Sequence, residues 1–223
     1  MTKHLSITAE KEAFLSSDQQ EAEIYFDILK DEITDFIKTI DYSSLTKAKN
    51  LILAAECEKK RIHITGIGKP AYVAGYMASL FSSTGTPAYY LHGTEAVHGS
   101  SGQVLPGDVV IAISNSGETA ELKATVKALK ENDVRIISVT RNRNSWLGRH
   151  SDIALTAKVS QEGDSLNRPP RCSIIAELIL LQSLSILLQN SHGLTEKQYI
   201  RWHPGGTIGD EIRRKAKDTS SIQ

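Results

Sequence analysis

The sequence lacks the features that would indicate a membrane, an oxidising compartment or a nucleic-acid partner. Its two cysteines, Cys57 and Cys172, lie far apart and show neither metal-site nor disulfide spacing. The 26 basic residues balance the 26 acidic ones, and no Lys/Arg block stands out. The apolar stretch 174–188 is too short to span a membrane and contains Glu177, and the N-terminus has no apolar signal centre. We therefore expect a cytoplasmic protein without nucleic-acid or membrane partners.

The sequence indicates one main domain, preceded by a helical N-terminal segment and followed by a polar C-terminal tail. Hydrophobic residues make up 40% of the 223 residues, enough for one sizeable core. Apolar residues recur at helical spacing from 18 to about 40, and Ser43 or Ser44 can cap a second helix to about 57. We predict a helical arm over 1–44 that serves packing or oligomerisation. The alternative is a helical hairpin that only covers the core. The main domain then spans 45–215, followed by a disordered tail over 216–223.

Strand and helix patterns alternate through the main domain. Short β-rich runs occur at 61–65, 86–91, 109–113, 135–139 and 153–157. Helical patterns follow the first, third and fourth of these runs, and a long apolar helix is predicted over 172–189. This order predicts an α/β fold: a doubly wound, parallel five-stranded sheet flanked by helices. Ligands in such sheets bind at the carboxyl ends of the strands, so the loops 66–70 and 114–119 are expected to face one ligand.

The turn after the third strand has the composition of an anion site. A buried run ends in Ser114-Asn115-Ser116-Gly117, and a helical pattern starts at Glu118. The first amides of a helix lack partners within the helix, and the helix dipole favours negative charge there. Ser114, Ser116 and Thr119 add hydroxyl groups, while Gly117 permits close approach of the backbone. The alternative is an ordinary turn with a serine cap.

The turn after the first strand reads Gly66-x-Gly68-Lys69-Pro70. It is too short for a Walker loop, and it lacks the third glycine and the acidic residue of a dinucleotide site. We therefore expect no nucleotide cofactor. The turn does place Lys69 at the same mouth as 114–119, although a lysine alone in such a place is often only structural.

Several titratable residues are candidates for chemistry. Glu118 and Glu121 lie three residues apart at a helix start. Acidic residues there can also be purely structural, because their charge interacts favourably with the helix dipole. Glu162 lies in a polar loop and would otherwise be only solvated. His203 lies in a His-Pro-Gly-Gly turn that can fix an imidazole for proton transfer, or leave it facing solvent.

His92 and His98 flank Glu95. Two histidines and a carboxylate suggest metal ligation, but the spacing is not that of a standard site, so we expect no metal. Both histidines remain possible substrate contacts.

Five motifs occur together in order: Gly66-Ile67-Gly68-Lys69, Ser83-Thr84-Gly85-Thr86-Pro87, Glu95-Ala96-x-His98-Gly99, Val109 to Glu118, and His203-Pro204-Gly205-Gly206. Over roughly residues 45–215 the chain resembles the sugar isomerase (SIS) domain of the arabinose-5-phosphate isomerase family. The Ser-x-Ser-Gly-Glu-Thr turn alone would indicate only an SIS domain that binds a phosphosugar.

The resemblance implies an aldose–ketose isomerase that interconverts arabinose 5-phosphate and ribulose 5-phosphate through an enediol, without cofactor or metal. It implies oligomerisation as a homodimer or homotetramer with sites shared between subunits, and His203 reaching a neighbour's pocket. The implied catalytic residues are Lys69, Glu121, Glu162 and His203. The implied phosphate and substrate contacts are Gly68, Ser114, Asn115, Ser116, Gly117 and Thr119.

The sequence departs from the family pattern at three places. Pro70 replaces the serine that usually follows the lysine, and Ser100 replaces an acidic residue after His-Gly. The segment before the long helix is usually rich in Thr and Ser after a proline, but here it reads Pro169-Pro170-Arg171-Cys172-Ser173. The loss of hydroxyl groups and the gain of Arg168 and Arg171 suggest a different or more acidic sugar phosphate. The chain also stops where many relatives continue into nucleotide-sensing CBS modules. The alternatives are therefore an isomerase of another sugar phosphate, or a non-catalytic sensor of one.

Overall fold

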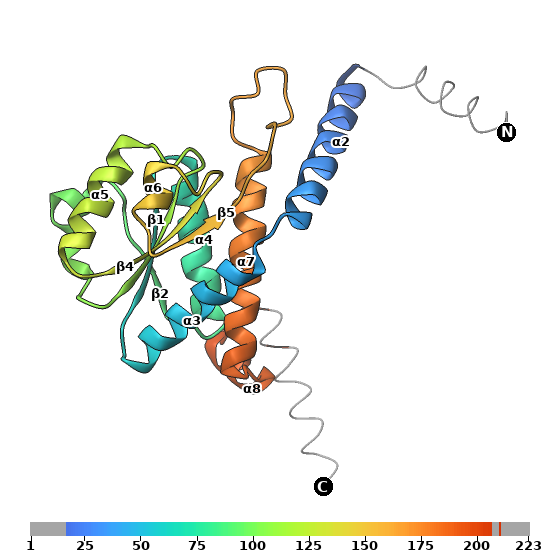
Figure 1. The fold of residues 1–223 in the computed structure, drawn as a ribbon. Helices are drawn as coiled ribbons and strands as arrows, with labels where there is room; N and C mark the ends of the chain where they lie inside the picture. The colour runs from blue at the N-terminus through green and yellow to red at the C-terminus, as the bar shows by residue number, and fades with distance from the viewer. Residues whose placement is uncertain (1–16, 207–209, 211–223) are drawn as a thin grey trace, which may run out of the picture.

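A computed structural model describes residues 17–206 and residue 210 (Figure 1). Five strands form one sheet with the order β2-β1-β3-β4-β5, and every neighbouring pair is parallel. The strands are β1 (Ile62–Gly66), β2 (Ala88–Tyr90), β3 (Val109–Ile113), β4 (Arg135–Thr140) and β5 (Ile153–Thr156). The predicted parallel five-stranded sheet is confirmed.

Helices cover both faces of the sheet, as a doubly wound fold requires. The helices α3 (Tyr42–Cys57), α4 (Lys69–Ser83) and α7 (Cys172–His192) form a layer on one side, and α5 (Ala120–Glu131) with α6 (Trp146–Arg149) lies on the other (Figure 1). Two short 3₁₀ segments, η1 (Glu95–His98) and η2 (Ser100–Gln103), occupy the connection between β2 and β3. The sequence pattern did not indicate these 3₁₀ turns.

The central strands β1, β3 and β4 are buried almost throughout, because helices cover both faces of the sheet. Alternate residues of one strand therefore enter different cores. In β3, Val109, Ile111 and Ile113 pack with α3, α4 and α7, whereas Val110 and Ala112 pack with α5. All five are fully buried. The strands β3 and β4 are followed directly by polar residues, Ser114 and Arg141.

The predicted apolar helix over 172–189 is confirmed as α7, which ends three residues later than predicted. It has 21 residues, so by length and composition it is the one helix of the described residues that qualifies as a membrane span. Half of that apolar window is buried, because Ala176, Leu180, Leu184 and Leu188 pack in the core with α3 and α4. The helix is thus apolar because it is a core helix, and the expectation that it was too short was wrong.

The helix α2 (Ser17–Lys38) precedes this core and packs on α7. Phe36 is its one buried residue, and Ile24, Phe26 and Ile37 are largely exposed. The predicted helix over 18–40 is confirmed, and its apolar surface agrees with a packing arm. The boundary at residue 44 falls inside α3 and remains a prediction. The tail 216–223 lies outside the described residues.

A hydrogen-bonded histidine and aspartate are buried at the amino-terminal edge of the sheet. His63 of β1 and Asp108 are each 1% exposed, and Nε2 of His63 donates to Oδ2 of Asp108 at 3.1 Å. The same carboxylate accepts the amides of Arg61 and Leu105 at 2.8 Å each. Burial lowers the pKa of His63 despite the nearby carboxylate. Asp108 therefore joins the start of β1, a neutral histidine and the turn before β3.

Replacing Asp108 with asparagine should destabilise the fold by about 1–3 kcal/mol, because one oxygen becomes a donor and leaves a buried amide or imidazole unpaired. Chemical denaturation measures this loss. The control is Asp133→Asn, at an exposed position with φ +53° that asparagine tolerates. Equal stability of the two variants would contradict the structural role of Asp108.

Candidate active site

The strand order places the topological switch point between β1 and β3. From this point the chain proceeds to β2 on one side and to β4 on the other, and ligands of open parallel sheets bind in the crevice formed there. The last residues of the two strands, Gly66 and Ile113, are paired in register. The turns 66–70 and 114–119 therefore leave the sheet from neighbouring positions at the same edge, as the sequence predicted.

The hydroxyl groups of residues 114–119, here named the anion turn, form an ordered chain. Oγ of Ser114 accepts the amide of Gly117 at 3.1 Å and lies 3.1 Å from Oγ1 of Thr119. Since Ser114 already accepts one bond, it can donate to Thr119, whose own proton is then free for a ligand. Thr119 is the N-cap residue of α5 but makes no side-chain cap bond. The hydroxyl group of Thr119 and the first amides of α5 therefore lie together at a helix start, an arrangement that suits an anion.

The anion turn is held from behind by α6. The amide of Leu147 donates to the carbonyl of Gly117 at 3.0 Å, and the amide of Trp146 donates to Oε1 of Glu118 at 2.7 Å. Lys123 also forms an ion pair with Glu118. The hydrogen bond from Lys123, followed by the amide of Trp146, lowers the pKa of Glu118. Glu118 therefore fixes the turn, while Ser116, which accepts the Glu118 amide at 3.1 Å, remains beside it as a further hydroxyl group of the turn.

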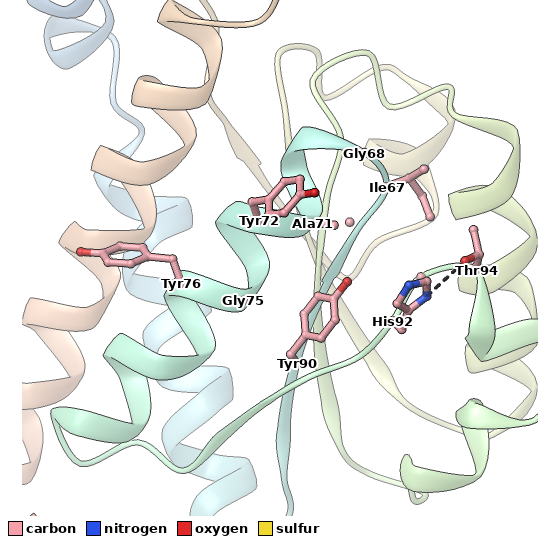
Figure 2. A pocket seen from close by; sticks show the side chains of 11 residues that line it. Ile67, Gly68, Ala71, Tyr72, Gly75, Tyr76, Tyr90, His92 and Thr94 are labelled. Carbon is pink, nitrogen blue, oxygen red and sulfur yellow. Dashed lines mark hydrogen bonds between the residues drawn. The ribbon is translucent and has the colours of Figure 1, made fainter.

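The turn after β1 borders a pocket of about 650 Å³, within the usual size range of small-molecule sites (Figure 2). Gly66, Ile67 and Gly68 form one wall, and Tyr90, His92 and Thr94 form another. Tyr72 and Tyr76 project from α4 beside it (Figure 2). A Cβ at Gly66 would lie 2.8 Å from the backbone of Pro70, so the turn is too tight for any side chain there.

His92 has a defined orientation in this pocket. Its Nδ1 accepts the amide of Glu95 at 3.2 Å and lies 3.1 Å from Oγ1 of Thr94, a contact visible in Figure 2. A ring nitrogen that accepts an amide proton cannot itself carry one, so the neutral ring is protonated at Nε2. Nε2 is then a donor available to the pocket. His98 ends η1, is exposed and does not line this pocket.

Lys69 and Glu121 lie at the same edge of the sheet and are both exposed. Lys69 is the first residue of α4 and borders an apolar groove between α4 and α7. Glu121 belongs to the first turn of α5. Pro70 follows Lys69 within the first turn of α4, where its missing amide breaks no helical bond. The departure at Pro70 therefore leaves the helix intact.

Glu162 is buried, which sequence reasoning did not anticipate. It is 8% exposed, and its Oε2 accepts the amides of Arg171 at 2.7 Å and of Ser173 at 3.1 Å. The side chain thus caps α7 from the preceding loop. It also lines a small cavity of about 70 Å³ together with Asn115 and Arg141. The structure therefore brings Glu162 to the anion turn, and the interpretation of a merely solvated loop glutamate was wrong.

Arg171, which the sequence placed near the mouth of the site, has a protein partner. Its guanidinium pairs with Asp164. Arg141, which the sequence reasoning did not single out, is the arginine that lines the cavity beside Asn115. Nothing in the sequence distinguishes Arg141 from the neighbouring Arg143, because the distinction depends on how the loop 157–171 folds back over the edge of the sheet.

His203 lies at the other end of the molecule within one chain. It follows α8 (Glu196–Trp202), and a Cβ at Gly85, just beyond the end of α4, would lie 3.4 Å from Trp202. Lys69 starts α4, whose 15 residues span about 22 Å. One chain therefore does not bring His203 to Lys69 and the anion turn. Its Nδ1–H donates to the carbonyl of Tyr199 at 2.7 Å, which leaves the lone pair on Nε2.

Comparison with known families settles what this architecture is. The family model of the SIS domain matches residues 57–187. This chain belongs to the SIS domain family.

Two relatives are named arabinose 5-phosphate isomerase KdsD. The protein of Francisella tularensis is 36% identical over 85% of this chain and 58% of its own length. That of Escherichia coli (strain K12) is 37% identical over 76% of this chain and 53% of its own length. The chain thus spans only about half the length of these curated relatives. The solved c3406 protein of E. coli CFT073, in complex with arabinose 5-phosphate, is 32% identical with a TM-score of 0.77, over 85% of this chain and 100% of that one.

The tyrosines of the pocket are what the sequence reasoning on this SIS domain missed. Tyr72 and Tyr76 are four residues apart on the predicted helix and therefore share a face. They are 82% and 47% exposed, which is unusual for rings on a helix that covers a sheet. Their four-residue spacing could have indicated that both rings lie on one face of the helix. The approach of Tyr90 from a neighbouring strand carried no local signal at all.

Proposed function

We propose that this protein is an aldose–ketose isomerase of a phosphosugar, interconverting D-arabinose 5-phosphate and D-ribulose 5-phosphate. The observation that carries the proposal is the anion turn at the switch point, with Glu162 and Lys69 at the same edge. The names of the relatives and the complex of the c3406 protein with arabinose 5-phosphate support the same substrate. The chain's cytoplasmic location and the absence of cofactor chemistry belong to this proposal.

The phosphate group occupies the anion position. The amides at the start of α5 and the hydroxyl groups of Ser116 and Thr119 donate to its oxygens, while Ser114, Asn115 and Gly117 shape the turn. The sugar then extends toward Gly68 and the pocket that contains His92. The Nε2–H of His92 is a donor for a sugar hydroxyl or carbonyl oxygen.

The reaction moves a proton between C1 and C2 through an enediol. This requires a base, and a donor for the oxygen that becomes negative in the transition state. Glu162 is a carboxylate held beside the anion turn, and Lys69 is a cation at the same edge. Glu121 lies on the first turn of α5, at the rim. These residues supply the acid–base groups of one chain.

His203 joins the site only from a neighbouring subunit. Its Nε2 lone pair suits a base, but its own chain holds it at the far end of α4. The protein therefore acts as a homodimer or homotetramer in which each site is completed by a second copy. The exposed apolar residues of α2 and of the groove between α4 and α7 give such copies surfaces to cover.

The first experiment incubates the pure protein with arabinose 5-phosphate and measures ribulose 5-phosphate. We expect turnover in both directions, and a higher melting temperature in the presence of the substrate because the ligand binds only the folded protein. Absence of turnover by a folded protein would contradict the activity. A rise in melting temperature without turnover would leave sugar-phosphate binding as the function.

A second candidate is an isomerase of another sugar phosphate. It is favoured by the tyrosine-lined pocket and by Arg141 beside Asn115, which add aromatic surface and positive charge to the edge. A panel of sugar phosphates in the same melting assay separates the two. Stronger stabilisation by a phosphosugar other than arabinose 5-phosphate would favour this candidate.

A further inference from the structure

Glu177 is a buried carboxyl group that the proposed mechanism does not use. It lies on the second turn of α7, is 1% exposed, and neither of its oxygens has a hydrogen-bond partner among the described residues. An isolated carboxylate in such surroundings is costly, because nothing replaces the water that it loses. An unpartnered buried group of this kind requires a physical explanation.

The groups packed around α7 offer no cation to Glu177 within the described part of the chain. From the preceding loop, the negative charge of Glu162 acts on it, and Arg171 pairs instead with Asp164. The charged groups of the helices packed against α7 have other partners or other neighbours. Glu32 of α2 accepts the amide of Ser160, Lys69 of α4 borders the groove with Ile174 and Leu178, and Glu56 of α3 pairs with His192 at the far end of α7.

The two carboxyl groups differ in what stabilises a negative charge. Glu162 accepts two amides at the start of α7, where the helix dipole also favours an anion. Glu177 accepts none, but Ser173 lies four residues before it on the same helix face, with an equally buried and unpartnered hydroxyl group. Burial, and then the charge of Glu162, raise the pKa of Glu177 from 4.5 to about 8. Near neutral pH, Glu177 therefore holds its proton.

We propose that Glu177 is a positioning residue that retains its proton, so that of these two carboxyl groups only Glu162 is negatively charged. Because the side chain of Glu177 is then neutral, Glu162 keeps its hydrogen bonds with the amides of Arg171 and Ser173, beside the anion turn. This inference rests on the proposed function only for the catalytic use of Glu162. Ionisation of Glu177 would place a second charge next to the first, and Glu162 would then be repelled from its amides.

The effect on stability has a definite sign. The pKa of Glu177 is higher in the folded protein, about 8, than its ordinary value of 4.5. Its contribution is therefore fully present below pH 4.5 and is lost as pH rises toward about 8. A variant without the ionisable group does not suffer this loss. Its stability relative to the natural protein should rise through that window and level off above it.

The test measures unfolding by urea for the natural protein, Glu177→Gln and Glu177→Met, two variants that keep the length of the side chain. The measurements run from about pH 5 to about pH 9, a range that covers the titration of Glu177. We expect both to gain stability relative to the natural protein as pH increases. Glu131→Gln, an exposed position at the end of α5, is the control and should show no such trend. A difference that does not depend on pH, or failure of both variants to fold, would overturn the proposal.

The positioning role is read from the pH profile of the isomerase. The rate of the natural protein should fall on the alkaline side as Glu177 ionises, and Glu177→Gln should keep its rate to higher pH. Identical profiles, with the pH-dependent stability gain present, would overturn the positioning role. If the natural protein shows no isomerase activity at all, the proposed function fails. The urea unfolding test still decides whether Glu177 retains its proton, because it does not depend on activity.

Discussion

Replacing Lys69 with methionine is expected to lower the turnover number by about 10²–10³-fold while leaving the affinity for the sugar phosphate nearly unchanged. Methionine keeps the length of the side chain and removes only its charge. Lys69 is exposed at the start of α4 and forms no ion pair in the described part of the chain, so the fold should not depend on it. In the proposed function the phosphate is held at the start of α5, by a different turn. The loss should therefore appear in catalysis and hardly in binding.

Steady-state kinetics and calorimetric titration with arabinose 5-phosphate separate the two effects. Lys127→Met is the matched control, because Lys127 is on α5 and lies 5.8 Å from the centre of the Trp146 ring, away from the reacting end. It should leave both quantities unchanged. A fall in affinity with unchanged turnover would instead assign Lys69 to phosphate binding, and equal activity of both variants would remove Lys69 from the mechanism.

The anion turn was predictable from the sequence because its parts are contiguous. Strand, hydroxyl groups and helix start follow one another from Val109 to Ala120, and local rules fix their geometry. The position of the turn beside Gly66 also followed, since carboxyl ends of parallel strands share an edge. What the composition did not reveal was which hydroxyl groups are internal. Ser114 is buried and holds the turn together by accepting the Gly117 amide, and only the packing of the folded turn decides this.

The roles of Glu162 and His203 depend on long-range folding, so residue type alone was a weak guide. Glu162 looked like a solvated loop residue because the loop 157–171 has no periodic pattern. It becomes buried because the loop returns to start α7, whose free amides need an acceptor. His203 was grouped with Lys69 by resemblance. The length of α4 separates them within one chain, and this separation follows from helix geometry.

Glu177 is a second acidic residue whose environment the sequence did not reveal. In the sequence, an acidic residue within the apolar stretch 174–188 served only as an argument against a membrane span. In the structure it is a core position, and burial beside Glu162 gives it a pKa of about 8. Helical spacing places position 177 on the same face as the buried Ser173. The spacing could therefore have indicated its burial, but not the absence of a cation.

The anion turn is also the place where a single methyl group should have a large effect. Gly117 has φ +66°, and a Cβ there would lie 2.1 Å from Oγ and 2.6 Å from Cβ of Ser145. Gly117→Ala should therefore combine backbone strain with overpacking, for a loss of about 3 kcal/mol of folding stability. Relief of the contact requires the turn to move off α6, which breaks the bond from the amide of Leu147. The hydroxyl groups and the first amides of α5 would then no longer converge on one phosphate.

We expect the affinity of Gly117→Ala for arabinose 5-phosphate to fall about 100-fold, as the loss of two charge-assisted hydrogen bonds implies. Calorimetric titration measures the affinity, and thermal unfolding measures the stability of the same sample. Gly102→Ala is the control, because a Cβ there meets no atom within 4 Å and the position needs no positive φ. It should bind normally. If Gly117→Ala is destabilised but binds with full affinity, the phosphate is held elsewhere, since a turn displaced from α6 cannot keep its donors aligned. The combined measurement therefore tests the anion site independently of whether isomerisation is observed.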